Sequence, residues 1–121
     1  MNVLDASALL AFLKGEPGAA AVQDALEGGA CCSAVNWSET AQKVAAAGGS
    51  WTLAAAGLDA FGLRVEPATG ADAERAAARW RVTSNLSLGD RFCLTLGERL
   101  GATVWTADRA WRGLDRVRLI R

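Results

Sequence analysis

Short apolar runs alternate with longer helix-like stretches along all 121 residues of this chain, and no other property of the sequence limits its possible folds as strongly. The runs favour short buried strands at residues 2–4, 30–35, 63–65, 103–105 and 117–120. Parallel strands need long crossover connections, which helices usually supply. We therefore expect an α/β fold in which helices cover both faces of a central parallel sheet.

The stretches between the runs predict helices at residues 7–14, 18–26, 36–47, 51–60, 71–82 and 88–100. Glycine pairs at residues 28–29 and 48–49 end two of them, and Asn36 is of the residue type expected at a helix N-cap. The sequence has no internal repeat and no low-complexity linker, and 51% of its residues are hydrophobic. This composition suits one core, so we expect a single domain over residues 1–121.

The cysteines and the apolar runs indicate the compartment. No run approaches the ~20 residues that cross a bilayer, and the N-terminus lacks a basic leader with a cleavage site. Cys31, Cys32 and Cys93 are odd in number and two are adjacent, unlike a disulfide framework or a paired-thiolate metal site. We expect a cytoplasmic protein without a membrane segment, in which all three thiols are reduced and mostly buried.

The chain contains no histidine. A Ser-His-Asp triad, a Cys-His pair, a zinc site with imidazole ligands and a histidine general base are therefore all excluded. Any hydrolytic chemistry has to depend on carboxylates.

The net charge is zero, but the charges are unevenly distributed along the chain. Residues 1–60 hold two lysines and six acids, whereas residues 61–121 hold eleven arginines and seven acids. A basic C-terminal half is typical of a surface that meets nucleic acid or an acidic partner, with Arg91, Arg109 and Arg112 as candidate phosphate contacts. The same excess also fits arginines that simply solvate helix surfaces.

Four acids follow or adjoin the carboxyl ends of predicted strands. Asp5 comes directly after the first strand, and Asp108 lies shortly after the strand at residues 103–105. We expect Glu39 in the first turn of the helix that leaves the second strand, and Asp90 at the start of the helix at residues 88–100. Ligands of open parallel sheets bind at the carboxyl ends of the strands, so these acids should meet in one crevice.

Helix capping is the alternative explanation for each acid. The segments 36–39 and 87–90 both match the capping-box pattern, and Asp5 and Asp108 have the residue type of plain N-caps. Taken together, however, four carboxylates at one sheet edge would repel one another unless a cation were bound.

A carboxylate cluster of this kind suits Mg²⁺ or Mn²⁺, which prefer oxygen ligands. Four acids suffice for one ion held partly through water or for two ions, and two ions about 3.5 to 4 Å apart would favour phosphodiester hydrolysis. Ser7 and Thr106 lie close enough in sequence to orient a metal-bound water, or they cap the adjacent helices.

Four segments resemble the ordered motifs of the PIN-domain nucleases. They are VLDASAL at residues 3–9, VNWSE at 35–39, LSLGDR followed by CL at 86–94, and WTADR at 105–109. Their order and separations match the family over essentially the whole chain. Most small single-domain members of that family are toxins of type II toxin–antitoxin pairs, and this chain resembles these VapC-like proteins.

The resemblance implies a three-layer α/β/α fold around a parallel sheet and Mg²⁺- or Mn²⁺-dependent cleavage of RNA. It also implies an antitoxin partner that holds the protein inactive, and a homodimer. Carried over by motif, the metal and catalytic residues are Asp5, Glu39, Asp90 and Asp108, with Ser7 and Thr106 in support.

Two other functions remain as alternatives. The first is a PIN domain that has lost catalysis and only binds RNA or a protein partner, which the complete set of four acids argues against. The second is a receiver domain or an aspartyl-phosphate phosphatase. Ser7 stands where such a phosphatase needs a second Asp, and the only lysines are Lys14 and Lys43, which does not suit a receiver.

Large apolar side chains suggest a core and an interaction surface. Trp37 and Trp105 are expected in the core, because large aromatics in such positions usually are, whereas Trp51, Trp80 and Trp111 are more open to a partner. The first helices carry apolar side chains that suit an antitoxin groove, the core or a dimer interface alike: Leu9, Leu10, Phe12 and Leu13.

Overall fold

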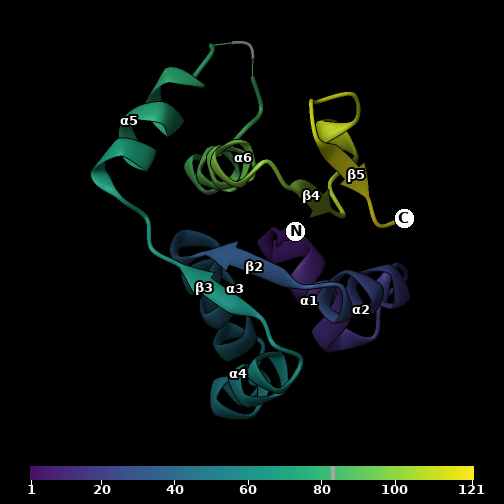
Figure 1. The fold of residues 1–121 in the computed structure, drawn as a ribbon. Coiled ribbons are helices and arrows are strands. Elements are labelled where there is room, and N and C mark those ends of the chain that lie inside the picture. The colour runs from purple at the N-terminus through teal and green to yellow at the C-terminus, as the bar shows by residue number, and fades with distance from the viewer. Residues whose placement is uncertain (83) are drawn as a thin grey trace.

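The computed structural model describes residues 1–82 and 84–121, and its centre is a five-stranded parallel sheet with the order β3-β2-β1-β4-β5. The strands are β1 (Asn2–Leu4), β2 (Ala30–Ser33), β3 (Arg64–Glu66), β4 (Thr103–Thr106) and β5 (Val117–Leu119). In register, Val3 of the central strand lies opposite Cys31 on one side and Val104 on the other. Figure 1 shows the sheet between two layers of helices, which confirms the expected three-layer α/β/α fold.

Helices connect the strands, and a short 3₁₀ segment precedes the last one. The bounds are α1 (Ala6–Lys14), α2 (Ala19–Glu27), α3 (Ala34–Ala46), α4 (Trp51–Ala60), α5 (Gly70–Ala78), α6 (Leu88–Leu100) and η1 (Arg109–Trp111). Among the described residues, none of these helices is both long and apolar enough to span a membrane.

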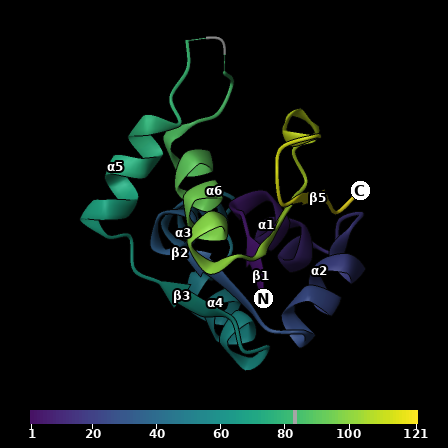
Figure 2. The same cartoon turned by 45° about the horizontal axis from the view of Figure 1, so that its top comes forward.

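The alternation of side chains along β1 divides the core into two parts. Leu4 packs with Leu9, Val22 and Leu58 in a cluster formed with α1, α2 and α4. Val3 faces the other way, into a cluster with α6 and η1. Helix α5 packs on α6 rather than on the sheet, as Figure 2 shows.

The second strand ends earlier than the sequence indicates, and the expectation that Asn36 caps the next helix is wrong. The Ser33 hydroxyl accepts a hydrogen bond from the Val35 backbone N–H at 3.1 Å, so Ser33 is the N-cap of α3. Asn36 therefore lies inside the helix and Glu39 lies in its second turn, not its first. The expected capping box between Asn36 and Glu39 does not exist.

The helix expected at residues 71–82 is also shorter, because α5 ends at Ala78. The Arg81 guanidinium donates to the carbonyl oxygens of Ala78 and Trp80 at 2.8 and 2.7 Å. The Ala78 carbonyl would accept the N–H of Val82 in a longer helix, so the arginine replaces that bond and lets the chain turn toward α6.

Most expectations for cysteine and tryptophan are confirmed, with exceptions at Trp111 and at Trp51, which is half-buried and packs edge-on against Trp37. All three cysteines are free and buried. Trp37 and Trp105 pack against the core, and Trp80 is 59% exposed. The expectation that Trp111 is open to a partner is wrong: it is 1% exposed, because it packs in the cluster between α6 and β4.

Candidate metal centre

Asp5 lies between the end of β1 and the start of α1, where it is only 5% exposed. Its Oδ1 accepts hydrogen bonds from the Ala8 backbone N–H at 2.8 Å and from the Ser7 hydroxyl at 2.7 Å. Its Oδ2 accepts one from the Thr106 hydroxyl at 2.6 Å. The carboxylate is thus an N-cap, as one interpretation of the sequence predicts, and it is held both from α1 and from β4.

Ser7 and Thr106 contact Asp5 directly and join the ends of β1 and β4. The Ser7 Oγ also accepts the Ala107 backbone N–H at 2.9 Å, and the Thr106 Oγ1 accepts that of Asp108 at 3.0 Å. The two hydroxyl oxygens lie 3.2 Å apart. Since each hydroxyl has one proton and Asp5 takes both, the two side chains orient the carboxylate together. Their predicted contact with a metal-bound water stays a prediction.

Burial raises the pKa of Asp5 from 3.8 to about 6, although hydrogen bonds from Thr106, Ser7 and Ala8 lower it in part. The negative charge of Asp90 raises it further, which shows that the two acids act on one another. A carboxylate in this position is costly to ionise without a cation nearby. A positive ion at this edge would therefore stabilise the ionised form.

Asp90 is half-buried in the first turn of α6, where it forms a capping box with Ser87. Its Oδ2 accepts the Ser87 backbone N–H at 2.9 Å, and the Ser87 hydroxyl accepts the Asp90 N–H at 3.1 Å. Burial, followed by the charges of Asp5 and Asp90, raises the pKa of the Cys93 thiol well above its usual value. Both carboxylates therefore act on the same buried group beneath the sheet edge.

Glu39 reaches from α3 to the first turn of α6. A Cβ atom added to Gly89 would lie 2.5 Å from Glu39 Oε1 and 2.6 Å from Oε2, closer than carbon and oxygen can approach. Only glycine leaves room for the carboxylate at this place. Gly89, the residue before Asp90, thus leaves the space in which Glu39 lies next to the turn that carries Asp90.

Asn36 is a site residue that the sequence analysis did not identify, because it treated Asn36 as a helix N-cap. It is 1% exposed, and its Nδ2 donates to Glu39 Oε1 at 2.7 Å and to the Gly89 carbonyl at 3.1 Å. Its Oδ1 is buried and has no hydrogen-bond partner in the described part of the chain. The available signal was the spacing of three residues from Glu39, which puts both side chains on one helix face.

Asp108 is exposed and stands at the outer margin of the group. Its Oδ1 accepts the Ala110 backbone N–H at 2.9 Å, so it caps η1. Within the described residues it is connected to Asp5 through Thr106, whose hydroxyl accepts the Asp108 N–H. Within residues 1–82 and 84–121, no three acid or cysteine side chains stand close enough to form a metal site by themselves.

The donor set nevertheless fits a hard divalent cation. The side chains at this edge offer only oxygen ligands, as Mg²⁺ and Mn²⁺ prefer. The space left by Gly89 admits the Glu39 carboxylate, and the buried Asn36 Oδ1 offers an acceptor that no protein group uses. Mg²⁺ keeps several of its waters and takes few direct carboxylate ligands. Asp5, Asp90 and Glu39 could therefore hold one ion partly through water molecules, without all three carboxylates contacting it.

Comparisons with known proteins agree with the fold described above. The chain is similar to a toxin–antitoxin complex from Klebsiella pneumoniae, with 17% identity over 100% of this chain and 98% of that chain and a TM-score of 0.76. It is also similar to VapBC2 from Rickettsia felis bound to a DNA fragment from their promoter, with 14% identity over 98% and 96% and a TM-score of 0.64. At these identities the likeness shows the fold. No curated protein sequence matches significantly.

The family model of the PIN domain matches residues 3–117, which include all four motifs and every acid of the candidate site. The resemblance inferred from the sequence is thereby confirmed, and the chain belongs to the PIN domain family.

Proposed function

We propose that this protein is a Mg²⁺- or Mn²⁺-dependent endoribonuclease that acts as the toxin of a type II toxin–antitoxin pair. Asp5, Glu39, Asp90 and Asp108 are its metal and catalytic residues. The single observation that carries the proposal is the buried Asp5 carboxylate, whose pKa of about 6 reflects burial and the neighbouring Asp90 charge, in a chain of the PIN family.

The chain's own residues have distinct roles in this proposal. Ser7 and Thr106 hold both oxygens of Asp5, while Asn36 holds one oxygen of Glu39. Asp90 stays oriented by its capping box. When bound, a divalent ion would polarise a phosphoryl oxygen and lower the pKa of water. The protein therefore contributes a fixed set of carboxylates and excludes water from Asp5.

RNA is the proposed substrate because exposed arginines adjoin the acid edge. Arg109 and Arg112 lie in and after η1, which Asp108 caps, and both are exposed. Arg91 is less suited to bind phosphate than the sequence suggests. It is half-buried, and its Nη1 donates to the Ala76 carbonyl at 2.9 Å, which attaches α6 to α5.

An antitoxin, a homodimer and a cytoplasmic location complete the proposal. The similar structures are a toxin–antitoxin complex and VapBC2, which supports a protein partner. Leu9 and Leu10 are core residues here, but Leu13 lines a groove of about 390 Å³ together with Val44 and Leu53. Leu53 is 74% exposed, so this groove offers apolar surface to an antitoxin segment.

Cleavage of a mixed RNA pool tests the proposal, with Mg²⁺, with Mn²⁺ and with EDTA. We expect metal-dependent cutting that the Asp90→Asn variant loses, while its melting temperature stays unchanged because Asn still accepts the Ser87 N–H. Asp24→Asn is the matched control, since that side chain is exposed on α2, a helix that carries none of the proposed site residues. Equal cutting by Asp90→Asn would refute the site.

A purely binding PIN domain is the second candidate. It is favoured by one observation: Asp5, Asp90 and Asp108 each already cap a helix, so each has a structural role without a metal. Retention of RNA by the purified protein in both EDTA and Mg²⁺, with no cutting in either, would establish this alternative.

A further inference from the structure

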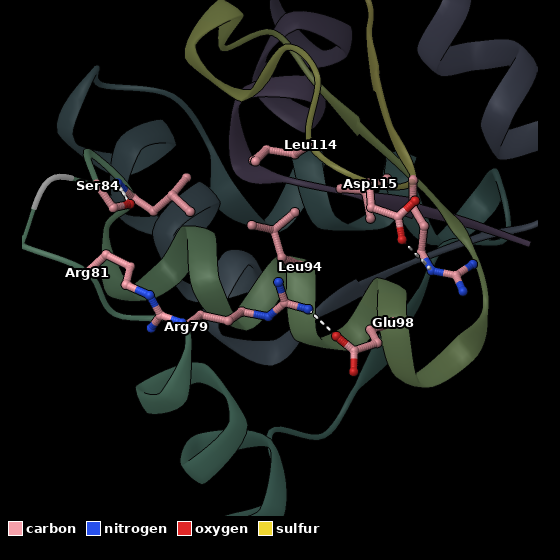
Figure 3. A pocket seen from close by; sticks show the side chains of 10 residues that line it. Arg79, Arg81, Ser84, Leu94, Glu98, Leu114 and Asp115 are labelled. Atoms are coloured by element: carbon pink, nitrogen blue, oxygen red, sulfur yellow. Dashed lines mark hydrogen bonds and ion pairs between the residues drawn. The ribbon is translucent and has the colours of Figure 1, made fainter.

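A cavity of about 470 Å³ lies between α6, the end of α5 and the chain that leads into β5. Leucine and valine side chains line its floor, and its rim carries three arginines and two acids. Figure 3 shows Leu94 of α6 and Leu114 pointing toward each other across it, with Arg79 and Arg81 along one side. The volume falls within the range of about 300 to 1,000 Å³ that is usual for small-molecule sites.

A second hollow of about 240 Å³ adjoins the first, because both are lined by Ser84, Leu86 and Leu114. This smaller hollow extends to Trp111. The indole N–H of Trp111 is buried and has no acceptor in the described residues. A buried donor without a partner costs about 1 to 3 kcal/mol, so a ligand acceptor that reaches this N–H after a small shift of the hollow's lining would be bound favourably.

Among the described residues that line the larger cavity, one arginine has no carboxylate partner. Arg79 pairs with Glu98, and Arg116 approaches Asp115 at 3.9 Å. The Arg81 guanidinium contacts two backbone carbonyls, and within the described residues no carboxylate pairs with it. Arg81 can therefore bind an anion without first breaking an ion pair.

The walls of the smaller hollow belong to the two loops that carry acids of the metal centre. Residues 84–86 come directly before the capping box of Ser87 and Asp90, and residues 110–114 come directly after the segment that Asp108 caps. The smaller hollow is thus bordered by residues that adjoin Asp90 and Asp108 in the chain.

The geometry points to a nucleotide subsite for a single-stranded RNA substrate, an inference that rests on the proposed nuclease function. The base lies against Leu86 and Leu114 and accepts a hydrogen bond from the Trp111 indole, and a flanking phosphate binds Arg81. A base suits this cavity because it combines apolar faces with acceptor edges, and proteins read unpaired RNA by such contacts.

Two substitutions test the subsite, each with a matched control. Arg81→Gln removes the uncompensated charge, and Arg64→Gln removes an exposed arginine from the opposite edge strand. Trp111→Phe removes the indole donor together with one ring of the side chain, and Trp80→Phe makes the same change at an exposed position outside both hollows. Because Trp111 is buried, the exposed Arg81 keeps the test decisive if Trp111→Phe fails to fold, and the melting temperature of Arg81→Gln checks that the end of α5, which Arg81 also contacts, is preserved.

Affinity for a short labelled single-stranded RNA is measured in EDTA, and kcat and KM for its cleavage are measured in Mg²⁺. We expect Arg81→Gln and Trp111→Phe each to weaken binding about three- to tenfold, mostly through KM, while both controls stay at the wild-type value. Trp111→Phe should also reduce the difference in affinity among oligoadenylate, oligouridylate and oligocytidylate.

The outcomes separate this inference from the proposed function. Metal-dependent cutting with unchanged KM in both variants overturns the subsite and leaves the nuclease intact. Absence of cutting, combined with RNA binding that the two variants weaken, overturns the nuclease and supports the subsite. If an acidic, tryptophan-containing peptide binds in an Arg81-dependent way while RNA does not, the cavity belongs to a protein partner and the nucleotide assignment is wrong.

Discussion

At the scale of single residues, Gly89 controls the position of Glu39. No side chain fits at Gly89 without displacing the carboxylate, since both carboxylate oxygens lie within 2.6 Å of the place that a Cβ would take. Position 89 is within a helix and its φ is not positive, so alanine is acceptable to the backbone there. A substitution at position 89 can therefore move Glu39 without disturbing the helix backbone.

We expect Gly89→Ala to lower kcat at least tenfold while leaving the melting temperature within a few degrees of the wild type. The reason is that Glu39 must move, whereas alanine favours helix over glycine by up to about 1 kcal/mol. Gly57→Ala is the control, because a Cβ there meets no atom within 4 Å. Full activity in Gly89→Ala would show that Glu39 is not needed where it stands.

The sequence predicts some site residues better than others. Asp5 is predictable because it directly follows a strand, and Asp90 because Ser87 precedes it by three residues in a capping box. The role of Asn36 is not predictable from the sequence, because it depends on the Gly89 carbonyl, 53 residues further along the chain. Contacts between distant segments leave no local pattern.

At the scale of helices and strands, α5 is held on α6 by a carboxylate clamp. Arg99 donates from Nε and Nη2 to the two oxygens of Asp72, at 3.1 and 3.3 Å. Asp72 also completes the capping box of α5 with Thr69. The clamp stands at the opposite end of α6 from Asp90, so it acts on the fold and not on the acids.

Burial raises the pKa of Asp72, but hydrogen bonds from the Thr69 backbone and from Arg99 outweigh it, and the pKa falls below 3.8. A depressed pKa gives stability that is present above the unfolded value and is lost as the pH falls through the folded value. At neutral pH we expect Asp72→Asn to lower the free energy of unfolding by about 1 kcal/mol, since the pair is partly exposed.

Thermal melts of Asp72→Asn and wild type from pH 7 to pH 2.5 check this expectation. The gap in melting temperature, about 4 °C at pH 7, should close only below about pH 4, where the wild-type carboxyl becomes protonated. Asp115→Asn should show no gap. A gap that persists unchanged at pH 2.5 would mean that the charge of Asp72 does not stabilise the fold.

Element boundaries depend on side chains that compete with the helix pattern. Residues 34 and 35 look like strand because they are apolar, yet Ser33 starts α3 before them. Residues 79–82 continue the amphipathic pattern of α5, yet Arg81 takes the carbonyl that would have extended it. The existence and order of the elements were predictable from the sequence, whereas these ends depend on individual hydrogen bonds.

At the scale of the whole molecule, the alternation of strands and helices predicted the parallel sheet and its two covered faces. It did not specify the strand order, in which β1 lies at the centre and the chain reaches the neighbouring β4 only after it has passed through β2 and β3. That order brings Asp5 beside Thr106, and so it is the reason why residues from the two ends of the chain share one site.

The distribution of charge also belongs to this scale. The net charge is zero, but the exposed Arg109 and Arg112 follow the acid edge directly. If both contact phosphates, the logarithm of RNA affinity should fall steeply with the logarithm of salt concentration. The double variant Arg109→Gln/Arg112→Gln should reduce the slope by about 1.4, at about 0.7 for each contact with a single strand.

Fluorescence titrations of labelled RNA at several salt concentrations give this slope, with Arg64→Gln as the control. A slope that the double variant leaves unchanged would assign the two arginines to ordinary solvated surface.

Binding of Mn²⁺ to the purified protein, measured by isothermal titration calorimetry beside the Asp5→Asn variant, tests the metal centre most directly. Asn at this position can still accept the Ala8 N–H, so α1 keeps its cap. We expect Mn²⁺ to bind the wild type and to raise its melting temperature, because it binds only the folded form, and we expect both effects to vanish in Asp5→Asn. Equal Mn²⁺ binding by the two proteins, or none by either up to millimolar concentration, would contradict a metal site at this edge of the sheet.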